Sequence, residues 1–125
     1  MSLKNYFKEI RDAYVINQVT NIKLPHFEKS PIVRKRLVFS GRVQNVGFRL
    51  ETYELSKKLN LTGWVKNNLD KNVEAEIQGE EEKINFLINY MKSLKRASVH
   101  NVVINELPLL KHETDFVVIK ETASI

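Results

Sequence analysis

Apolar and polar residues alternate along some stretches of the chain and recur at helical spacing along others. Alternation predicts strands at residues 33–40, 63–67, 73–78, 99–104 and 116–120. Helical spacing predicts one helix that starts near Phe48 and ends at Asn60, and another that follows Gly79 and has Glu80, Glu81 and Glu82 in its first turn. The expected core positions are Phe48, Thr52, Leu55 and Leu59 in the first helix and Ile84, Leu87, Ile88, Met91 and Leu94 in the second.

These elements follow the order β-α-β-β-α-β-β, which is a doubled split βαβ unit. The order predicts a ferredoxin-like α/β (α+β) sandwich, β-α-β-β-α-β plus a fifth strand, with two helices on one face of a mostly antiparallel sheet. In the first strand, Val33, Leu37 and Phe39 should share one face and Arg34, Arg36 and Val38 the other. The charged side of the first helix should be exposed, and it carries Glu51, Glu54, Lys57 and Lys58.

A separate segment, residues 1–31, precedes this pattern. Ser2 can cap a helix whose apolar stripe is Leu3, Phe7, Ile10 and Tyr14, and residues 25–31 are expected to form a linker between two prolines. The stripe must be buried somewhere, by packing on the domain, by docking on the open sheet face or in a homodimer. A membrane-surface or targeting role is the alternative, against which Glu9 and Asp12 count. We therefore expect two units, residues 1–31 and residues 32–125.

Composition limits the chemistry that this chain can perform. The 125 residues include no cysteine, which removes disulfides and thiolate chemistry. The three histidines, His26, His100 and His112, lack metal-ligand spacing, so no metal and no cofactor are expected. No apolar run has the length of a membrane span or of a signal-peptide core. We expect a soluble, cytoplasmic protein with no membrane partner.

The net charge of +5 belongs to one part of the chain. Residues 1–36 hold eight basic and three acidic side chains, whereas residues 37–125 are balanced. The third strand also presents Glu74 and Glu76 on its polar face, where an RNA-binding sheet needs aromatic side chains. No nucleic-acid partner is therefore expected.

The candidate chemistry lies at Gly41–Arg49, which reads Gly-Arg-Val-Gln-Asn-Val-Gly-Phe-Arg between a strand and a helix. Such a turn directs backbone N–H groups and the positive end of the helix dipole at one point, where a phosphate can bind. Arg49, in the first helical turn, could close over the anion with two hydrogen bonds. An ordinary strand-to-helix loop with a solvated arginine is the alternative.

Asn67 is the second candidate, at the end of the strand Gly63-Trp-Val-Lys-Asn67. Its amide offers one acceptor and a donor group, which suits the positioning of a water molecule. The turn preference of asparagine offers a simpler explanation, in which Asn67 and Asn68 only open the hairpin.

Together the two motifs resemble the signatures of the acylphosphatase family, a Gly-x-Val-Gln-Gly-Val-x-Phe-Arg loop and a Gly-Trp-Val-x-Asn strand. The resemblance covers about residues 33–120. It implies hydrolysis of an acyl phosphate, a small molecule, to a carboxylate and inorganic phosphate, without a metal or a covalent intermediate. It also implies that Arg49 and the loop N–H groups bind the phosphoryl group and that Asn67 orients the water. The loop residues are Val43, Gln44, Asn45, Val46, Gly47 and Phe48.

Two positions depart from the family pattern. Asn45 and Asn72 stand where the family usually has glycine, and both are expected to adopt the left-handed conformation that asparagine tolerates. Because the side chain of Asn45 enters the phosphate loop, a catalytically silent phosphate-binding or regulatory module remains the alternative to an enzyme.

Overall fold

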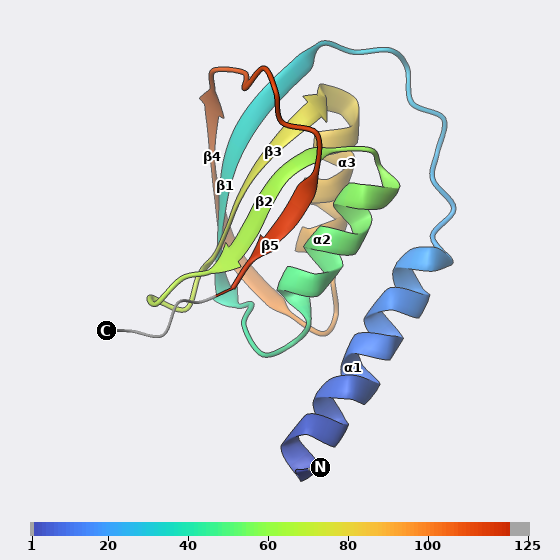
Figure 1. The fold of residues 1–125 in the computed structure, drawn as a ribbon, viewed down its shortest axis with the longest axis vertical. Coiled ribbons are helices and arrows are strands. Elements are labelled where there is room, and N and C mark those ends of the chain that lie inside the picture. The colour runs from blue at the N-terminus through green and yellow to red at the C-terminus, as the bar shows by residue number, and fades with distance from the viewer. Residues whose placement is uncertain (1, 121–125) are drawn as a thin grey trace.

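The computed structural model describes residues 2–120 of the chain (Figure 1). The elements in order are α1 (Leu3–Thr20), β1 (Ile32–Arg42), α2 (Phe48–Lys58), β2 (Thr62–Asn67), β3 (Val73–Glu80), α3 (Glu81–Lys92), β4 (Ser98–Leu107) and β5 (Phe116–Ile119). All five strands and both domain helices were predicted, although β1 and β4 extend beyond the predicted ranges.

The strands form one sheet in the order β4-β1-β3-β2-β5. β1 pairs antiparallel with both β3 and β4, β2 pairs antiparallel with β3, and β5 runs parallel to β2. α2 and α3 cover one face of this sheet, and α1 lies beside α2 (Figure 1). The ferredoxin-like α+β fold is therefore confirmed.

The core lies between the sheet and its two helices. Leu37 and Phe39 of β1 are fully buried there, as are Phe48 and Leu55 of α2. The rings of Phe39 and Phe48 meet edge to face, with their centroids 5.0 Å apart. Because these two residues flank the predicted phosphate loop, their contact fixes both ends of that loop.

Glu51 was expected on the exposed side of α2, and that prediction is wrong. Its side chain is fully buried and accepts a 2.8 Å hydrogen bond from the hydroxyl of Tyr90. It also pairs with the guanidinium of Arg96. The charge is tolerated inside because partners from distant parts of the chain satisfy it.

The apolar stripe predicted for the first helix is not its buried face. Leu3, Phe7, Ile10 and Tyr14 are each at least half exposed. Val15 and Val19 are buried instead, on the side that packs against α2. Lys58 of α2 donates hydrogen bonds to the carbonyls of Val19, Thr20 and Ile22 and so caps the end of α1. Ser2 caps its start as expected, accepting from the N–H of Asn5.

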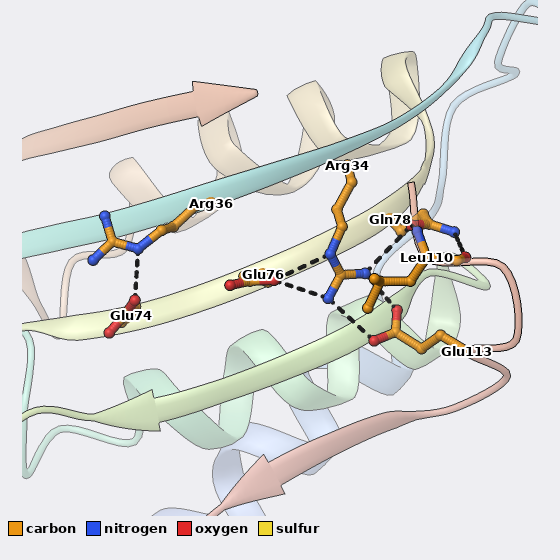
Figure 2. A network of polar contacts seen from close by, with 7 residues as sticks. All are labelled: Arg34, Arg36, Glu74, Glu76, Gln78, Leu110 and Glu113. Atoms are coloured by element: carbon orange, nitrogen blue, oxygen red, sulfur yellow. Dashed lines mark hydrogen bonds and ion pairs between the residues drawn. The ribbon is translucent and has the colours of Figure 1, made fainter. Parts of the chain in front are cut away.

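The sheet face away from α2 and α3 carries paired charges (Figure 2). Arg34 and Arg36 lie on it as predicted, but Arg34 is almost completely buried because the segment before β5 covers it. Glu113 of that segment pairs with Arg34 at 2.7 Å, and Glu76 pairs with it at 3.1 Å. Burial lowers the pKa of Arg34, but these two carboxylates outweigh that effect and raise it.

Candidate active site

The phosphate loop begins at an irregularity in β1. The pairing register between β1 and β4 shifts between Ser40 and Gly41, and Gly41 has a φ of 120°. A Cβ atom at Gly41 would lie only 2.1 Å from the carbonyl oxygen of Ser98, so a side chain is excluded there. The bulge turns the chain out of the sheet and into the loop.

Two residues of the loop have left-handed backbones. Asn45 has a φ of 63°, and Gly47, the residue that precedes α2, has a φ of 78°. The prediction for Asn45 is confirmed. The matching prediction for Asn72 is wrong, because Lys71 is the residue of the hairpin turn with positive φ, at 72°.

Backbone N–H groups of this loop are available to a ligand. Two backbone hydrogen bonds lie within and next to the loop. The N–H of Val43 donates to the carbonyl of Gly41 at 3.1 Å, and the N–H of Glu51 donates to the carbonyl of Gly47 at 2.9 Å. Neither uses the N–H groups of residues 44–48, which donate to no other group in the described part of the chain. Five successive N–H groups at the start of α2 thus have no acceptor within residues 2–120, which is what an anion-binding loop requires.

Gln44 links this loop to the hairpin between β2 and β3. Its side-chain amide donates to the carbonyl of Asn68 at 2.8 Å and to that of Asn72 at 2.9 Å. Asn68 directly follows Asn67, so the two bonds fix the end of β2 relative to the loop. The loop and the hairpin are therefore in direct contact.

Asn67 and Arg49 line the same cleft, which has a volume of about 960 Å³. The side-chain oxygen of Asn67 is enclosed and has no hydrogen-bond partner among residues 2–120. Leaving such an acceptor unpaired costs about 1–3 kcal/mol. The oxygen itself is not exposed to the cleft, although the Asn67 side chain lines it.

Of the predicted loop residues, four also line the cleft, namely Val43, Asn45, Gly47 and Phe48. Gln44 and Val46 do not line it and contact neighbouring segments instead. Nε of Arg96 donates to the carbonyl of Val46 at 2.8 Å while the same guanidinium pairs with buried Glu51. The loop is therefore supported from behind by a charged network that reaches Tyr90, whose pKa is raised by burial and by Glu51.

Sequence reasoning missed two contributions to this cleft. The first is the Arg96 network, for which the sequence gives no signal because its members lie on separate elements. The second is α1, which packs directly against the loop: a Cβ at Gly47 would lie 2.9 Å from Cγ2 of Val15. The charged residues of α1 that line the cleft are Lys4, Lys8, Arg11 and Asp12.

Metal-binding clusters and membrane-spanning helices are two further features that the described residues lack. No group of three or more His, Asp or Glu side chains within residues 2–120 is arranged to hold a metal ion. In the same range, no helix combines the length and the apolar composition that a membrane span requires.

The fold and the cleft together define a ferredoxin-like domain whose cleft lies at the strand-to-helix loop before α2. The acylphosphatase family model matches residues 35–118. An acylphosphatase of Picrophilus torridus is 49% identical over 57 residues, which cover 46% of this chain and 70% of that protein. An acylphosphatase of Clostridium beijerinckii is 40% identical over 86 residues, which cover 68% of this chain and 96% of that protein.

Solved structures give the same result. The acylphosphatase of Coxiella burnetii superposes with a TM-score of 0.66 at 32% identity and covers 70% of this chain and 93% of its own. The chain therefore belongs to the acylphosphatase family and is a hydrolase of that kind. Residues 1–34, which include α1, lie outside the matched range.

Proposed function

We propose that the protein hydrolyses the carboxyl-phosphate bond of small acyl phosphates and that Arg49, the loop N–H groups and Asn67 carry the reaction. The N–H groups of residues 44–48 and the guanidinium of Arg49 would bind the phosphoryl oxygens, whereas the N–H of Val43, which was also expected to do so, already donates to the carbonyl of Gly41. Asn67 would hold the attacking water. The observation that carries this proposal is that Asn67 and Arg49 line one cleft together with four residues of the loop.

The reaction suits a site built in this way. Water attacks phosphorus, the bond between phosphorus and the acyl oxygen breaks, and the carboxylate leaves with the electron pair. A carboxylate is a stable leaving group, so it needs little help from a general acid, and positioning and charge stabilisation supply most of the rate. A non-bridging phosphoryl oxygen of the substrate would accept the water's proton.

The first test is hydrolysis of benzoyl phosphate by the wild type and by Asn67→Ala, each with and without EDTA. We expect the variant to lose about 100-fold or more in kcat, which corresponds to about 3 kcal/mol of barrier. Its inhibition constant for inorganic phosphate should change much less, because phosphate is bound by the loop. Chelation should leave the wild-type rate unchanged, in keeping with a reaction that uses no metal.

Asn68→Ala is the matched control, because Asn68 follows Asn67 in the hairpin and is not among the residues that line the cleft. If it lost as much activity as Asn67→Ala, the effect would be on the hairpin and the role of Asn67 would be refuted. A folded wild type that binds phosphate without turnover would instead identify a binding module. The cytoplasmic location and the two-unit division at residue 31 remain predictions.

A further inference from the structure

The cleft is built from two sources, the family domain and the helix that precedes it. The domain contributes the phosphate loop, Arg49 and Asn67 at one wall. α1 contributes another wall, through Lys4, Asn5, Phe7, Lys8, Arg11 and Asp12. Because α1 lies outside the range that the family model matches, this wall is a property of this chain.

α1 is held firmly enough to act as a wall. Its buried residues Val15 and Val19 pack toward α2, and Lys58 caps its last carbonyls at 2.6–3.0 Å. Gln18 accepts a 3.4 Å hydrogen bond from Arg96, the residue that also holds the loop. These contacts hold the C-terminal half of the helix, and Lys4 and Lys8 line the cleft from its exposed N-terminal half.

The charge of the cleft exceeds what one phosphoryl group requires. Among residues 2–120, five basic side chains line it, Lys4, Lys8, Arg11, Arg49 and Lys120, and one acidic side chain does so, Asp12. Asp12 is paired with its neighbour Arg11 at 3.2 Å. Lys4 and Lys8 make no ion pair with any residue in the range 2–120. Two ammonium groups are therefore available on the α1 wall in addition to the phosphate loop.

The cleft is also larger than a phosphate and is lined in part by apolar side chains. Its volume of about 960 Å³ lies at the upper end of small-molecule sites, which span roughly 300–1,000 Å³. Phe7 of α1 and Leu50, Tyr53 and Val118 of the domain line it. A short carbon chain could lie on these side chains between the phosphate loop and the lysines.

We infer that Lys4 and Lys8 form a second anion subsite, and that the preferred substrates are acyl phosphates whose acyl group ends in a carboxylate. This inference rests on the proposed function and names the substrate class for the same cleft. The phosphoryl group lies in the loop, the acyl chain crosses the apolar surface, and the distal carboxylate meets the two ammonium groups. Both lysines are exposed, so each contributes a modest, salt-sensitive attraction.

The test compares two substrates that differ in the distal group, succinyl phosphate with a terminal carboxylate and butyryl phosphate with a terminal methyl. The wild type should have the higher kcat/KM for succinyl phosphate, mainly through a lower KM. Lys4→Gln/Lys8→Gln should reduce the succinyl-to-butyryl ratio by about fivefold or more. Lys8→Glu should reduce it further, and added salt should reduce it in the wild type.

The matched control is Lys23→Gln/Lys111→Gln, which removes the same charge from two exposed lysines that do not line the cleft. It should leave the ratio unchanged. A wild type that hydrolyses butyryl phosphate but shows no preference for succinyl phosphate would overturn this inference alone. The inference would also be overturned if the succinyl-to-butyryl ratio fell as much in the control variant as in Lys4→Gln/Lys8→Gln. Failure to hydrolyse either substrate would refute the proposed function itself.

Discussion

Nε of Arg96 donates a hydrogen bond of 2.8 Å to the carbonyl oxygen of Val46, in the middle of the phosphate loop. A carbonyl that is held on the far side of a loop leaves the N–H groups of its neighbours turned toward the cleft. The same guanidinium pairs with buried Glu51 and contacts Gln18 of α1. One side chain thus connects the loop, α2 and α1.

Arg96→Lys should lower kcat/KM for an acyl phosphate by about tenfold. Lysine keeps the charge beside Glu51, but its single ammonium cannot reproduce the planar fork that reaches both the Val46 carbonyl and the Glu51 carboxylate. Because the loop would lose its support, the inhibition constant for inorganic phosphate should rise by a similar factor. Steady-state kinetics with phosphate as inhibitor measures both quantities.

Arg42→Lys is a suitable control for this experiment, because Arg42 is exposed and its bond goes to the carbonyl of Arg96 rather than to the loop. It should change neither kcat/KM nor the inhibition constant for inorganic phosphate by more than about twofold, because surface substitutions usually have small effects. An unchanged phosphate affinity in Arg96→Lys, with activity lost, would show that Arg96 does not act through the loop.

The order of elements could be predicted because each one carries its own local pattern. Alternation in residues 73–78 and helical spacing from Phe48 to Leu59 are local signals, and the strand-to-helix turn at Gly41–Arg49 is another. The same is true of Asn45, since asparagine tolerates positive φ whatever surrounds it. In the hairpin, the left-handed residue is Lys71 and not the predicted Asn72, which follows it directly.

The features that were missed depend on contacts between distant residues. Glu51 looks like a surface residue because its burial depends on Tyr90 and Arg96, about 40 positions away. The burial of Arg34 could not be predicted because Glu113, which covers it, follows only after five further elements (Figure 2). Helical periodicity could not decide which face of α1 packs, since the stripe Leu3, Phe7, Ile10 and Tyr14 is apolar and so are Val15 and Val19.

Gly47 and Val15 test whether α1 lies against the phosphate loop. Gly47→Ala should lower the free energy of unfolding by about 2 kcal/mol or more, because the residue has a φ of 78° and its new Cβ would lie 2.9 Å from Cγ2 of Val15. In the background of Val15→Ala, the clash is absent and only the backbone strain remains. In that background, Gly47→Ala should therefore lower the free energy of unfolding by about 1 kcal/mol less than it does in the wild type.

Urea unfolding of the wild type, the two single variants and the double variant measures this coupling. Ile16→Ala replaces Val15→Ala in a control cycle, because Ile16 is a neighbouring residue of α1 that is largely exposed. That cycle should show no coupling with Gly47→Ala. Equal losses in all backgrounds would mean that α1 does not contact the loop in solution.

Asn45 tests whether the departure from the family pattern affects the site. Asn45→Gly should retain the fold and have a kcat/KM at least equal to that of the wild type, since glycine adopts a φ of 63° without strain and opens the cleft. Asn45→Ala should lose about 1 kcal/mol of stability for the same backbone reason. Thermal unfolding and acyl phosphate hydrolysis measure the two effects. A tenfold loss of activity in Asn45→Gly would show instead that the asparagine side chain binds the substrate.

Tyr90 should make the stability of the protein depend on alkaline pH. Burial and the neighbouring Glu51 raise its pKa above the ordinary value of 10.0, so the folded state favours the neutral phenol that donates to Glu51. For a group with a raised folded pKa, this contribution is fully present below the unfolded pKa of about 10. It is lost as the pH rises from there through the folded pKa, because only the unfolded chain then releases the proton.

Tyr90→Phe removes the hydroxyl and should lower the free energy of unfolding at pH 7 by about 1–2 kcal/mol, the usual contribution of a hydrogen bond to a charged group. The difference in the free energy of unfolding between the wild type and the variant should become smaller above pH 10. Urea unfolding at pH 7 and at pH 10.5 measures this change. Tyr6→Phe, on the exposed face of α1, is the control and should show no such change. A difference that stayed constant with pH would mean that the phenol titrates alike in the folded and unfolded chains.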